Sequence, residues 1–212
     1  IKAGLVEING EVCLEMGKKV GVNDVVKYAG ETVKREQYRY ILINKPKNFV
    51  MGLPRNKGQQ SIFDIIKGAC KESVAPVGKL HKDATGLMLM TNDQDVAFKL
   101  NKSKTKSSFK VECTDIVRFS HLNEFMGGVK LKEGGTLKTS EAFFPDKNDH
   151  KIVMLSANTS KPQIVQQLFA QFGYTIKNID RLSLAGIAKG DLNRGKWRFL
   201  TDKEIGFLKM LS

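Results

Sequence analysis

The residues best suited to chemistry lie in one stretch, residues 76–93, with the sequence PVGKLHKDATGLMLMTND. A turn containing a glycine leads into ionisable side chains and then into an apolar run, Leu87–Met90, which predicts a buried strand. Loops that end a buried strand often carry sites, because a rigid scaffold positions their exposed polar groups. His81 could serve as a general base, or in principle as a nucleophile, and Asp83 follows two residues later. In an extended segment Asp83 would share the face of His81, whereas in a tight turn it need not.

Length and composition predict a soluble protein with one good-sized domain, or one such domain and a small appendage. The chain has 212 residues, 41% of them apolar. Its longest apolar runs, about five residues, are far short of the roughly 20 that cross a membrane, and no signal peptide is evident, so we expect a cytoplasmic location without a membrane partner. The three cysteines and three histidines are scattered, which predicts neither disulfides nor a bound metal, and no cofactor.

Net charge is the strongest compositional signal. A formal charge of +13 and a pI near 9.6 are typical of a chain with a polyanionic partner, usually nucleic acid. Most of the excess is lysine, which acts as a point charge on phosphate, whereas arginine offers the fork that recognises bases. The composition therefore favours recognition of a nucleic-acid backbone, and the alternative is a solvated lysine-rich surface.

The first 36 residues predict a small β-rich module, including a linker, that is too short for a core of its own. Alternation over Leu5–Val12 breaks at Asn9-Gly10, which is a tight-turn signal. The segment contains the pattern G-x-V-x-I-N-G, followed by spaced glycine, valine and aspartate residues. This pattern resembles that of the C-terminal half of an S4 RNA-binding domain. That likeness implies that the preceding helices of such a domain lie upstream of Ile1. An unspecific hairpin is the alternative.

Residues 37–212 mix strand-like and helix-like segments without regular βαβ order, which predicts an α+β domain with a mainly antiparallel sheet. Periodicity predicts strands at residues 40–46, 87–90, 109–113, 129–131, 151–156, 176–184 and 195–199. Helices are predicted at 62–70, 95–100, 120–126, 161–172 and after Thr201. Ser61, Ser120, Ser160 and a Thr201–Glu204 capping box are the predicted starts of four of them.

Five segments, in order over roughly residues 40–208, resemble the ribosomal-RNA pseudouridine synthases that carry an N-terminal S4 domain. They are the N-K-P-K-G strand end (44–48, with Asn48 for the glycine), F-D-L-L (63–66), the signature G-R-L-D-x-x-T-x-G-L-L-L-L-T-N-D (78–93), G-V-x-L-x-D-G (128–134) and G-x-W-R-x-L-T-x-x-E (195–204). The resemblance implies a pseudouridine-synthase-like fold, with a curved, mainly antiparallel sheet, flanking helices and a central cleft.

The resemblance also implies three catalytic groups, and this sequence departs from all three. The family detaches uracil from its ribose and rejoins it through carbon 5, using a signature aspartate, a tyrosine against the base and a basic partner of the aspartate. Those positions hold His81, Phe109 and Gln166. The losses are mutually consistent, because a buried charge left without its partner costs several kcal/mol. Phe109 keeps a stacking face and lacks the hydroxyl.

Charge and resemblance together predict contacts with RNA around the signature loop. The predicted RNA-binding residues are Lys45, Lys47, Lys79, Lys82, Thr85 and Lys110. Lys79 stands where the signature has an arginine, which is a milder change than those at the catalytic positions.

Three hypotheses for function follow. The first is a catalytically impaired member of the family that binds structured RNA, ribosomal by resemblance, as a monomer. The second is an active isomerase that flips its target uridine into the cleft. A third is a scaffold that kept only the fold and binds no RNA.

Overall fold

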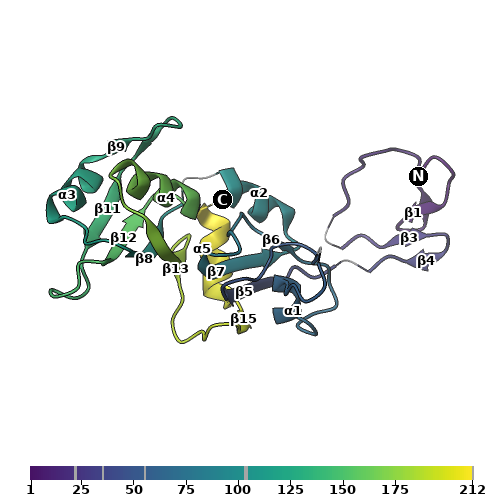
Figure 1. Ribbon diagram of the computed structural model, residues 1–212. Helices are drawn as coiled ribbons and strands as arrows, with labels where there is room; N and C mark the ends of the chain where they lie inside the picture. The colour runs from purple at the N-terminus through teal and green to yellow at the C-terminus, as the bar shows by residue number, and fades with distance from the viewer. Residues whose placement is uncertain (22, 35, 55, 103–104, 212) are drawn as a thin grey trace. The chain divides into compact units, whose positions relative to one another are not determined.

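The computed structural model describes residues 1–21, 23–34, 36–54, 56–102 and 105–211 (Figure 1). The chain divides into two compact units, Ile1–Gln37 and Tyr38–Ser212. This boundary lies one residue from the predicted one. The two units are described separately.

The N-terminal unit is a small sheet in the order β2-β1-β3-β4. Its strands are β1 (Val6–Ile8), β2 (Glu11–Val12), β3 (Val26–Tyr28) and β4 (Glu31–Thr32). The turn between β1 and β2 needs left-handed backbone, with φ of 54° at Asn9 and 91° at Gly10, which suits this residue pair. The predicted hairpin is therefore present, and its S4 likeness stays a prediction.

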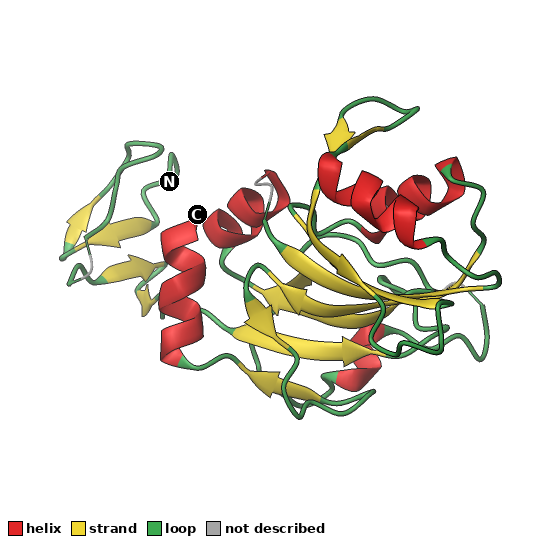
Figure 2. Cartoon of the chain, turned by 90° about the vertical axis from the view of Figure 1, so that its left-hand side faces the viewer, coloured by secondary structure: helices red, strands yellow, loops and turns green. Residues whose placement is uncertain are grey.

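The large unit is built on a sheet that contains nine strands among the described residues. Its main path runs β11-β12-β8-β13-β7-β5-β15, with β14 paired to β13 and β6 to β7. The bounds are β5 (Tyr40–Lys45), β6 (Ala75–Pro76), β7 (Thr85–Thr91), β8 (Ser107–Cys113), β11 (Thr139–Phe143), β12 (Ile152–Ala157), β13 (Ile176–Leu184), β14 (Ile187–Ala188) and β15 (Trp197–Phe199). A separate hairpin joins β9 (Val129–Lys130) to β10 (Thr136–Leu137). Figure 2 shows the large sheet as a twisted, curved surface.

Strands β5 and β7 are buried on both faces because helices cover the sheet on each side there. Along β7, Met88 and Met90 belong to one hydrophobic core, and Leu87 and Leu89 belong to the other. Successive side chains of a strand point to opposite faces, so an unbroken apolar run fits a strand between two layers. The run that marked residues 87–90 as a strand is explained by this double burial.

Five helices are described in this unit, and they divide between the two faces. They are α1 (Ile62–Ile65), α2 (Gln94–Lys102), α3 (Phe119–Gly127), α4 (Pro162–Gln171) and α5 (Asp202–Leu211). Residues of α1, α3 and α4 pack in the core with Met88 and Phe109, and residues of α2 and α5 pack in the core with Leu87. Figure 1 shows α3 and α4 beside the β8–β12 half of the sheet. None of the described helices is long and apolar enough to cross a membrane.

The two halves of the sheet meet at one short parallel contact, which fixes the place of the signature loop. Strand β13 pairs in parallel with β7 only through Asp180 with Thr85 and Arg181 with Gly86, while the other pairings in the sheet are antiparallel. A Cβ on Gly86 would lie 2.3 Å from the Arg181 carbonyl oxygen and 2.4 Å from its nitrogen. Gly86 also has a φ of 110°. The glycine of the signature is thus required by backbone crowding at this crossing.

Helix starts and ends correct the sequence reading in three places. The helix that begins after Ser61 stops at Ile65 instead of residue 70, because the chain turns there and reaches a φ of 80° at Gly68. Helix α4 has Lys161 as its N-cap instead of Ser160, and α3 has Arg118 as its N-cap instead of Ser120. The capping boxes at Ser61–Asp64 and Thr201–Glu204 are both formed.

Candidate functional site

The signature loop makes a tight turn at His81, the position matched to the family's aspartate. The Ala84 backbone N–H donates to the His81 carbonyl at 3.1 Å, and this turn brings Nδ1 of His81 to 3.1 Å from Oδ2 of Asp83. Both side chains are exposed, 60% for His81 and 53% for Asp83. Nδ1 also accepts a long hydrogen bond, 3.5 Å, from the Asp83 backbone N–H. In the other tautomer Nδ1 donates to the carboxylate and Nε2 is left as an acceptor, which is the arrangement that a general base requires. The turn therefore settles the open question about Asp83, which lies beside His81.

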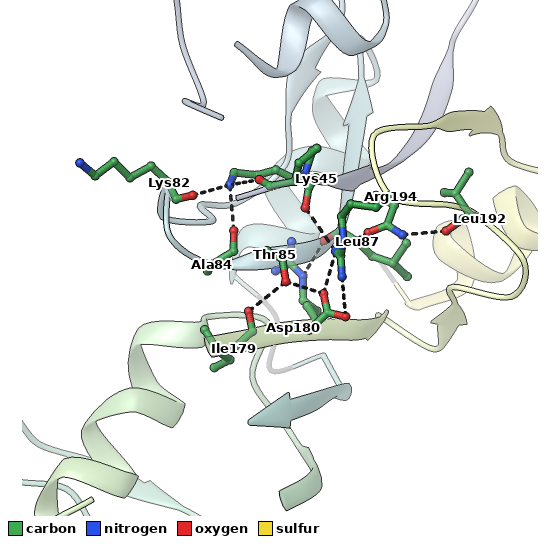
Figure 3. A network of polar contacts seen from close by, with 12 residues as sticks. Lys45, Lys82, Ala84, Thr85, Leu87, Ile179, Asp180, Leu192 and Arg194 are labelled. Atoms are coloured by element: carbon green, nitrogen blue, oxygen red, sulfur yellow. Dashed lines mark hydrogen bonds and ion pairs between the residues drawn. The ribbon is translucent and has the colours of Figure 1, made fainter. Parts of the chain in front are cut away.

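Lys45, at the end of β5, is hydrogen-bonded to the backbone of this loop on its buried side. Its Nζ donates to the carbonyl oxygens of Pro46 at 2.9 Å, Lys82 at 3.1 Å and Ala84 at 2.8 Å (Figure 3). The Asn48 backbone N–H adds a fourth hydrogen bond, to the Lys82 carbonyl at 2.8 Å. All three protons of the ammonium are used on backbone carbonyls, so this lysine fixes the path of the loop that presents His81.

The burial of Lys45 and Thr85 corrects their assignment as RNA contacts. Lys45 is completely buried and Thr85 is 6% exposed. Burial lowers the pKa of Lys45 to about 8, an effect that Arg194 increases and Asp83 opposes. The Thr85 hydroxyl donates to the Asp180 carboxylate at 2.8 Å. In this arrangement both residues shape the loop from within, and neither side chain is available to a phosphate.

A buried polar network lies at the crossing of β7 and β13, beside the loop (Figure 3). Arg194 binds Asp180 in a bidentate pair, with Nη1 to Oδ1 at 2.8 Å and Nη2 to Oδ2 at 2.9 Å. Nη1 also donates to Oδ1 of Asn44 at 2.6 Å, and Nδ2 of Asn44 donates to the Leu192 carbonyl at 2.7 Å. Both oxygens of the Asp180 carboxylate are occupied, so this group is structural and ties the 185–196 loop to the sheet junction.

The other two positions matched to catalytic groups differ from each other in exposure. Phe109 is fully buried, in the same core as Leu80 and Ala84 of the signature loop and Val165 of α4. Gln166 is half-buried on α4. The fold thus gathers the surroundings of all three positions around one core, but it encloses the ring of Phe109. The predicted open stacking face is not present in this arrangement.

Four of the six predicted RNA contacts are exposed. Lys47, Lys79, Lys82 and Lys110 have exposed side chains. Lys110 lies directly opposite Asp180 on the neighbouring strand, so both residues are on the face of the sheet away from Phe109. These four exposed lysines remain the candidate phosphate contacts.

Sequence reasoning missed Asp180, Arg181 and Arg194. The sequence does contain one indication of them: Asp180 and Arg181 are adjacent ionisable residues in a segment whose other residues predict a buried strand. Charged residues are rarely buried without a partner, so this pair predicts partners elsewhere in the chain. Their partners are remote in sequence: Arg194 reaches Asp180, and Nε of Arg181 donates to the Leu87 carbonyl at 2.7 Å. Only the strand crossing brings these groups together.

Comparison with known proteins agrees with this geometry. The profile of the RNA pseudouridylate synthase family matches residues 39–171. The chain is 29% identical over 216 residues to the ribosomal large subunit pseudouridine synthase B of Bacillus subtilis, covering 100% of this chain and 88% of that protein. It is 27% identical over 210 residues to the ribosomal small subunit pseudouridine synthase A of Vibrio parahaemolyticus, covering 97% and 89%. The crystal structure of a pseudouridylate synthase superposes with a TM-score of 0.69 at 21% identity, covering 98% of this chain and 90% of that chain.

The fold is that of a pseudouridine synthase, and the prediction of this fold class is confirmed. The family profile spans well over half of the chain, including β5, the signature loop, β8 and all of α4. The protein belongs to the RNA pseudouridylate synthase family.

Proposed function

We propose that this protein is an RNA-binding member of the family whose catalytic centre is impaired, and that its partner is ribosomal RNA. The observation that carries the proposal is the turn at residues 81–84, which presents a histidine where the family signature has its aspartate. The relatives named above are ribosomal large and small subunit pseudouridine synthases, which supports ribosomal RNA as the class of partner.

The carboxylates of Asp83 and Asp180 are both engaged by other side chains. Asp83 lies against His81 at 3.1 Å on the exposed turn. Asp180 is buried, and its two oxygens are held by Arg194 and Thr85. A nucleophile or base at the sugar needs a carboxylate oxygen that is free to approach it, so Asp180 is excluded from this role while the network is intact.

A second candidate function is an active isomerase in which the His81–Asp83 pair replaces the aspartate. The contact between Nδ1 and Oδ2 favours it, because Asp83 would orient the ring and leave Nε2 as the base. Gln166 agrees with this alternative as well, since a neutral side chain there does not repel a histidine that gains a proton.

Tritium release from carbon-5-labelled uridine in ribosomal RNA separates the two candidates. We expect no release above background. Turnover that is lost in both His81→Ala and Asp83→Ala, and retained in the control Lys147→Ala, an exposed lysine outside the loop, would establish the isomerase instead. The triple variant His81→Asp, Phe109→Tyr and Gln166→Arg restores the family groups, and a gain of release in it would show that the rest of the site still accepts RNA.

RNA affinity measured against salt tests the binding function itself. Lysine contacts with phosphates release counterions, so the logarithm of affinity falls with the logarithm of salt concentration by about 0.7–0.9 per phosphate contacted. We expect a steep slope that becomes shallower by about one contact for each of Lys79→Gln and Lys82→Gln. A flat slope in the unmodified protein would leave the scaffold hypothesis.

The N-terminal unit, residues 1–37, is proposed as a partial S4-like RNA-binding module. Its turns carry Lys18 and Lys19, both exposed. Lys18→Gln with Lys19→Gln should weaken RNA binding in the full chain without changing its melting temperature; unchanged binding would favour an unspecific hairpin. We further propose a monomer, and a light-scattering mass of twice 23.7 kDa would contradict this.

A further inference from the structure

A pocket of about 440 Å³ lies between the β9–β10 hairpin and the first turn of α4. Thr136 and Lys138 line it from the hairpin side, and Asn158, Ser160 and Lys161 line it from the segment that leads into α4. Two of its lining residues are lysines and none is a carboxylate. His81, Phe109 and Gln166 do not line it, so this pocket is separate from the three positions matched to catalytic groups.

The guanidinium of Arg181 extends to the wall of this pocket from inside the protein. Its Nη1 donates to the Ser160 carbonyl at 2.5 Å, and its Nε donates to the Leu87 carbonyl. Arg181 is 1% exposed, and its buried Nη2 has no hydrogen-bond partner among the described residues. Burial lowers the pKa of Arg181 to about 10, so the group is still charged at neutral pH.

No ion pair to Arg181 is found in the described part of the chain. A buried cation that has only carbonyl partners and one unused N–H is costly unless an anion compensates it. The Ser160 carbonyl that accepts from Arg181 belongs to a residue that lines the pocket, so an anion in this pocket would lie beside the buried guanidinium.

Two further polar groups lie unsatisfied along the strand that leads into the pocket wall. In the sheet register, Ala157 is flanked by Ser107 of β8 and Thr139 of β11. Both hydroxyls are buried and lack a hydrogen-bond partner among the residues that the structure describes. Both hydroxyls lie beside Ala157, the last residue of β12, which directly precedes the pocket-lining residue Asn158.

The first turn of α4 adds positive potential to the same pocket. The helix has ten residues, its N-cap is Lys161, and no side chain caps it. There is no acidic residue in its first turn. The positive end of the helix dipole is therefore not neutralised locally, and this arrangement favours an anion.

We propose that this pocket binds a phosphate group of the RNA backbone, with Lys138 and Lys161 as the direct contacts and Arg181 as the buried charge behind them. The inference rests on the proposed RNA-binding function and assigns one anchoring point to it. The lysines and the helix end recognise the phosphate without reading a base, which agrees with a lysine-rich protein that recognises the nucleic-acid backbone.

The test compares two double variants with the same change in net charge. The pocket variant, Lys138→Gln with Lys161→Gln, removes the proposed contacts. The matched control is Lys147→Gln with Lys203→Gln. Both control lysines are exposed, and they lie in the loop between β11 and β12 and on α5. Thermal melting in inorganic phosphate is compared with melting in chloride at equal ionic strength. Phosphate should raise the melting temperature of the unmodified protein and the control, and this shift should be lost in the pocket variant.

The RNA arm measures the salt dependence of affinity for the same three proteins. The steepness of this log–log slope should fall by the equivalent of about two phosphate contacts in the pocket variant, and by less in the control. An equal phosphate response in both variants, or an equal salt slope, would overturn the pocket. A flat slope already present in the unmodified protein would instead remove the proposed RNA-binding function, and RNA as the occupant, while the phosphate arm still decides whether the pocket takes an anion.

Discussion

The exposed turn at residues 81–84 and the buried crossing of β7 and β13 lie next to each other and differ in almost every physical respect. The turn holds a histidine and a carboxylate that face solvent. The crossing holds Lys45, Thr85 and the Asp180–Arg194 pair, linked by hydrogen bonds to backbone and to one another. The family motifs are kept where they reach the crossing, at Lys45 and Gly86, and the resemblance fails at the centre of the turn, at His81.

This difference separates what a fold needs from what a reaction needs. The groups of a buried polar network need their partners, because each group left unpaired lowers the free energy of unfolding. An exposed side chain on a turn has no such constraint, so its chemistry can change without cost to stability. A family member can therefore lose the reactive group while keeping the loop that presented it.

The largest expected effect is at the backbone contact of the crossing. Gly86→Ala should destabilise the protein by at least about 3 kcal/mol, because the new Cβ overlaps the backbone of Arg181 and the φ of 110° is strained for any other residue. Urea unfolding measures this, or loss of soluble protein if the variant does not fold. The control is Gly127→Ala, whose Cβ meets nothing within 4 Å. Equal stability of the two variants would mean that the strands can separate at this point.

The next effect is at the Asp180–Arg194 pair. Arg194→Met should cost about 2 kcal/mol, because it leaves the nearly buried Asp180 carboxylate without its cation, and the partial exposure of Arg194 keeps the loss below that of a fully buried pair. Lys177→Met is the matched control, since it breaks the exposed pair with Glu112 and should leave stability unchanged. A double-mutant cycle with Asp180→Asn measures the coupling directly. Absence of coupling would show that the junction does not depend on this pair.

Lys45 gives a pH-dependent comparison. Its folded-state pKa of about 8 is below the value of about 10.4 for an unfolded lysine. The unfolded chain then binds more protons in that window, so the stability contributed by this group rises with pH between these two values. Relative to Lys45→Met, the unmodified protein should gain on the order of 1 kcal/mol in free energy of unfolding between pH 7 and 9.5.

The burial of two other groups changes stability with pH in the opposite direction, and comparing variants cancels them. Burial raises the pKa of Cys113 to about 12, and burial together with Asp93 also raises the pKa of Tyr40. Both groups are present in the unmodified protein and in Lys45→Met, so their contributions cancel in the difference. Lys47→Met is the control, because Lys47 is an exposed lysine two residues along the chain, and its stability difference from the unmodified protein should not change with pH in this way. A constant difference across the pH range would mean that the three carbonyls hold the ammonium as well as water does.

The smallest expected effect is on the turn. His81→Ala and Asp83→Ala should change the melting temperature by no more than about 2 °C, because both side chains are exposed and such substitutions rarely affect stability. Differential scanning calorimetry measures this. A large loss in either variant would place the turn with the crossing as a structural element and would weaken the argument that its chemistry changed freely.

Much of the fold could be predicted from local patterns. The apolar run at residues 87–90 and the alternation at 109–113 correspond to β7 and β8, because strand periodicity depends on which faces are covered. The Thr201–Glu204 box predicted the start of α5, since capping is a contact between residues close in sequence. Ser160 was wrong as the cap of α4 because the chain turns into that helix one residue later.

The sequence alone determined the family resemblance and the three altered positions, since motifs and spacing require no coordinates. The tertiary structure decided which of the named residues face solvent. It buried Lys45 and Thr85, enclosed Phe109 and joined Asp180 to Arg194. The physical reason is that burial and ion pairing depend on strands and loops far apart in the chain. One short parallel contact between β7 and β13 brings those segments together, and local sequence does not encode it.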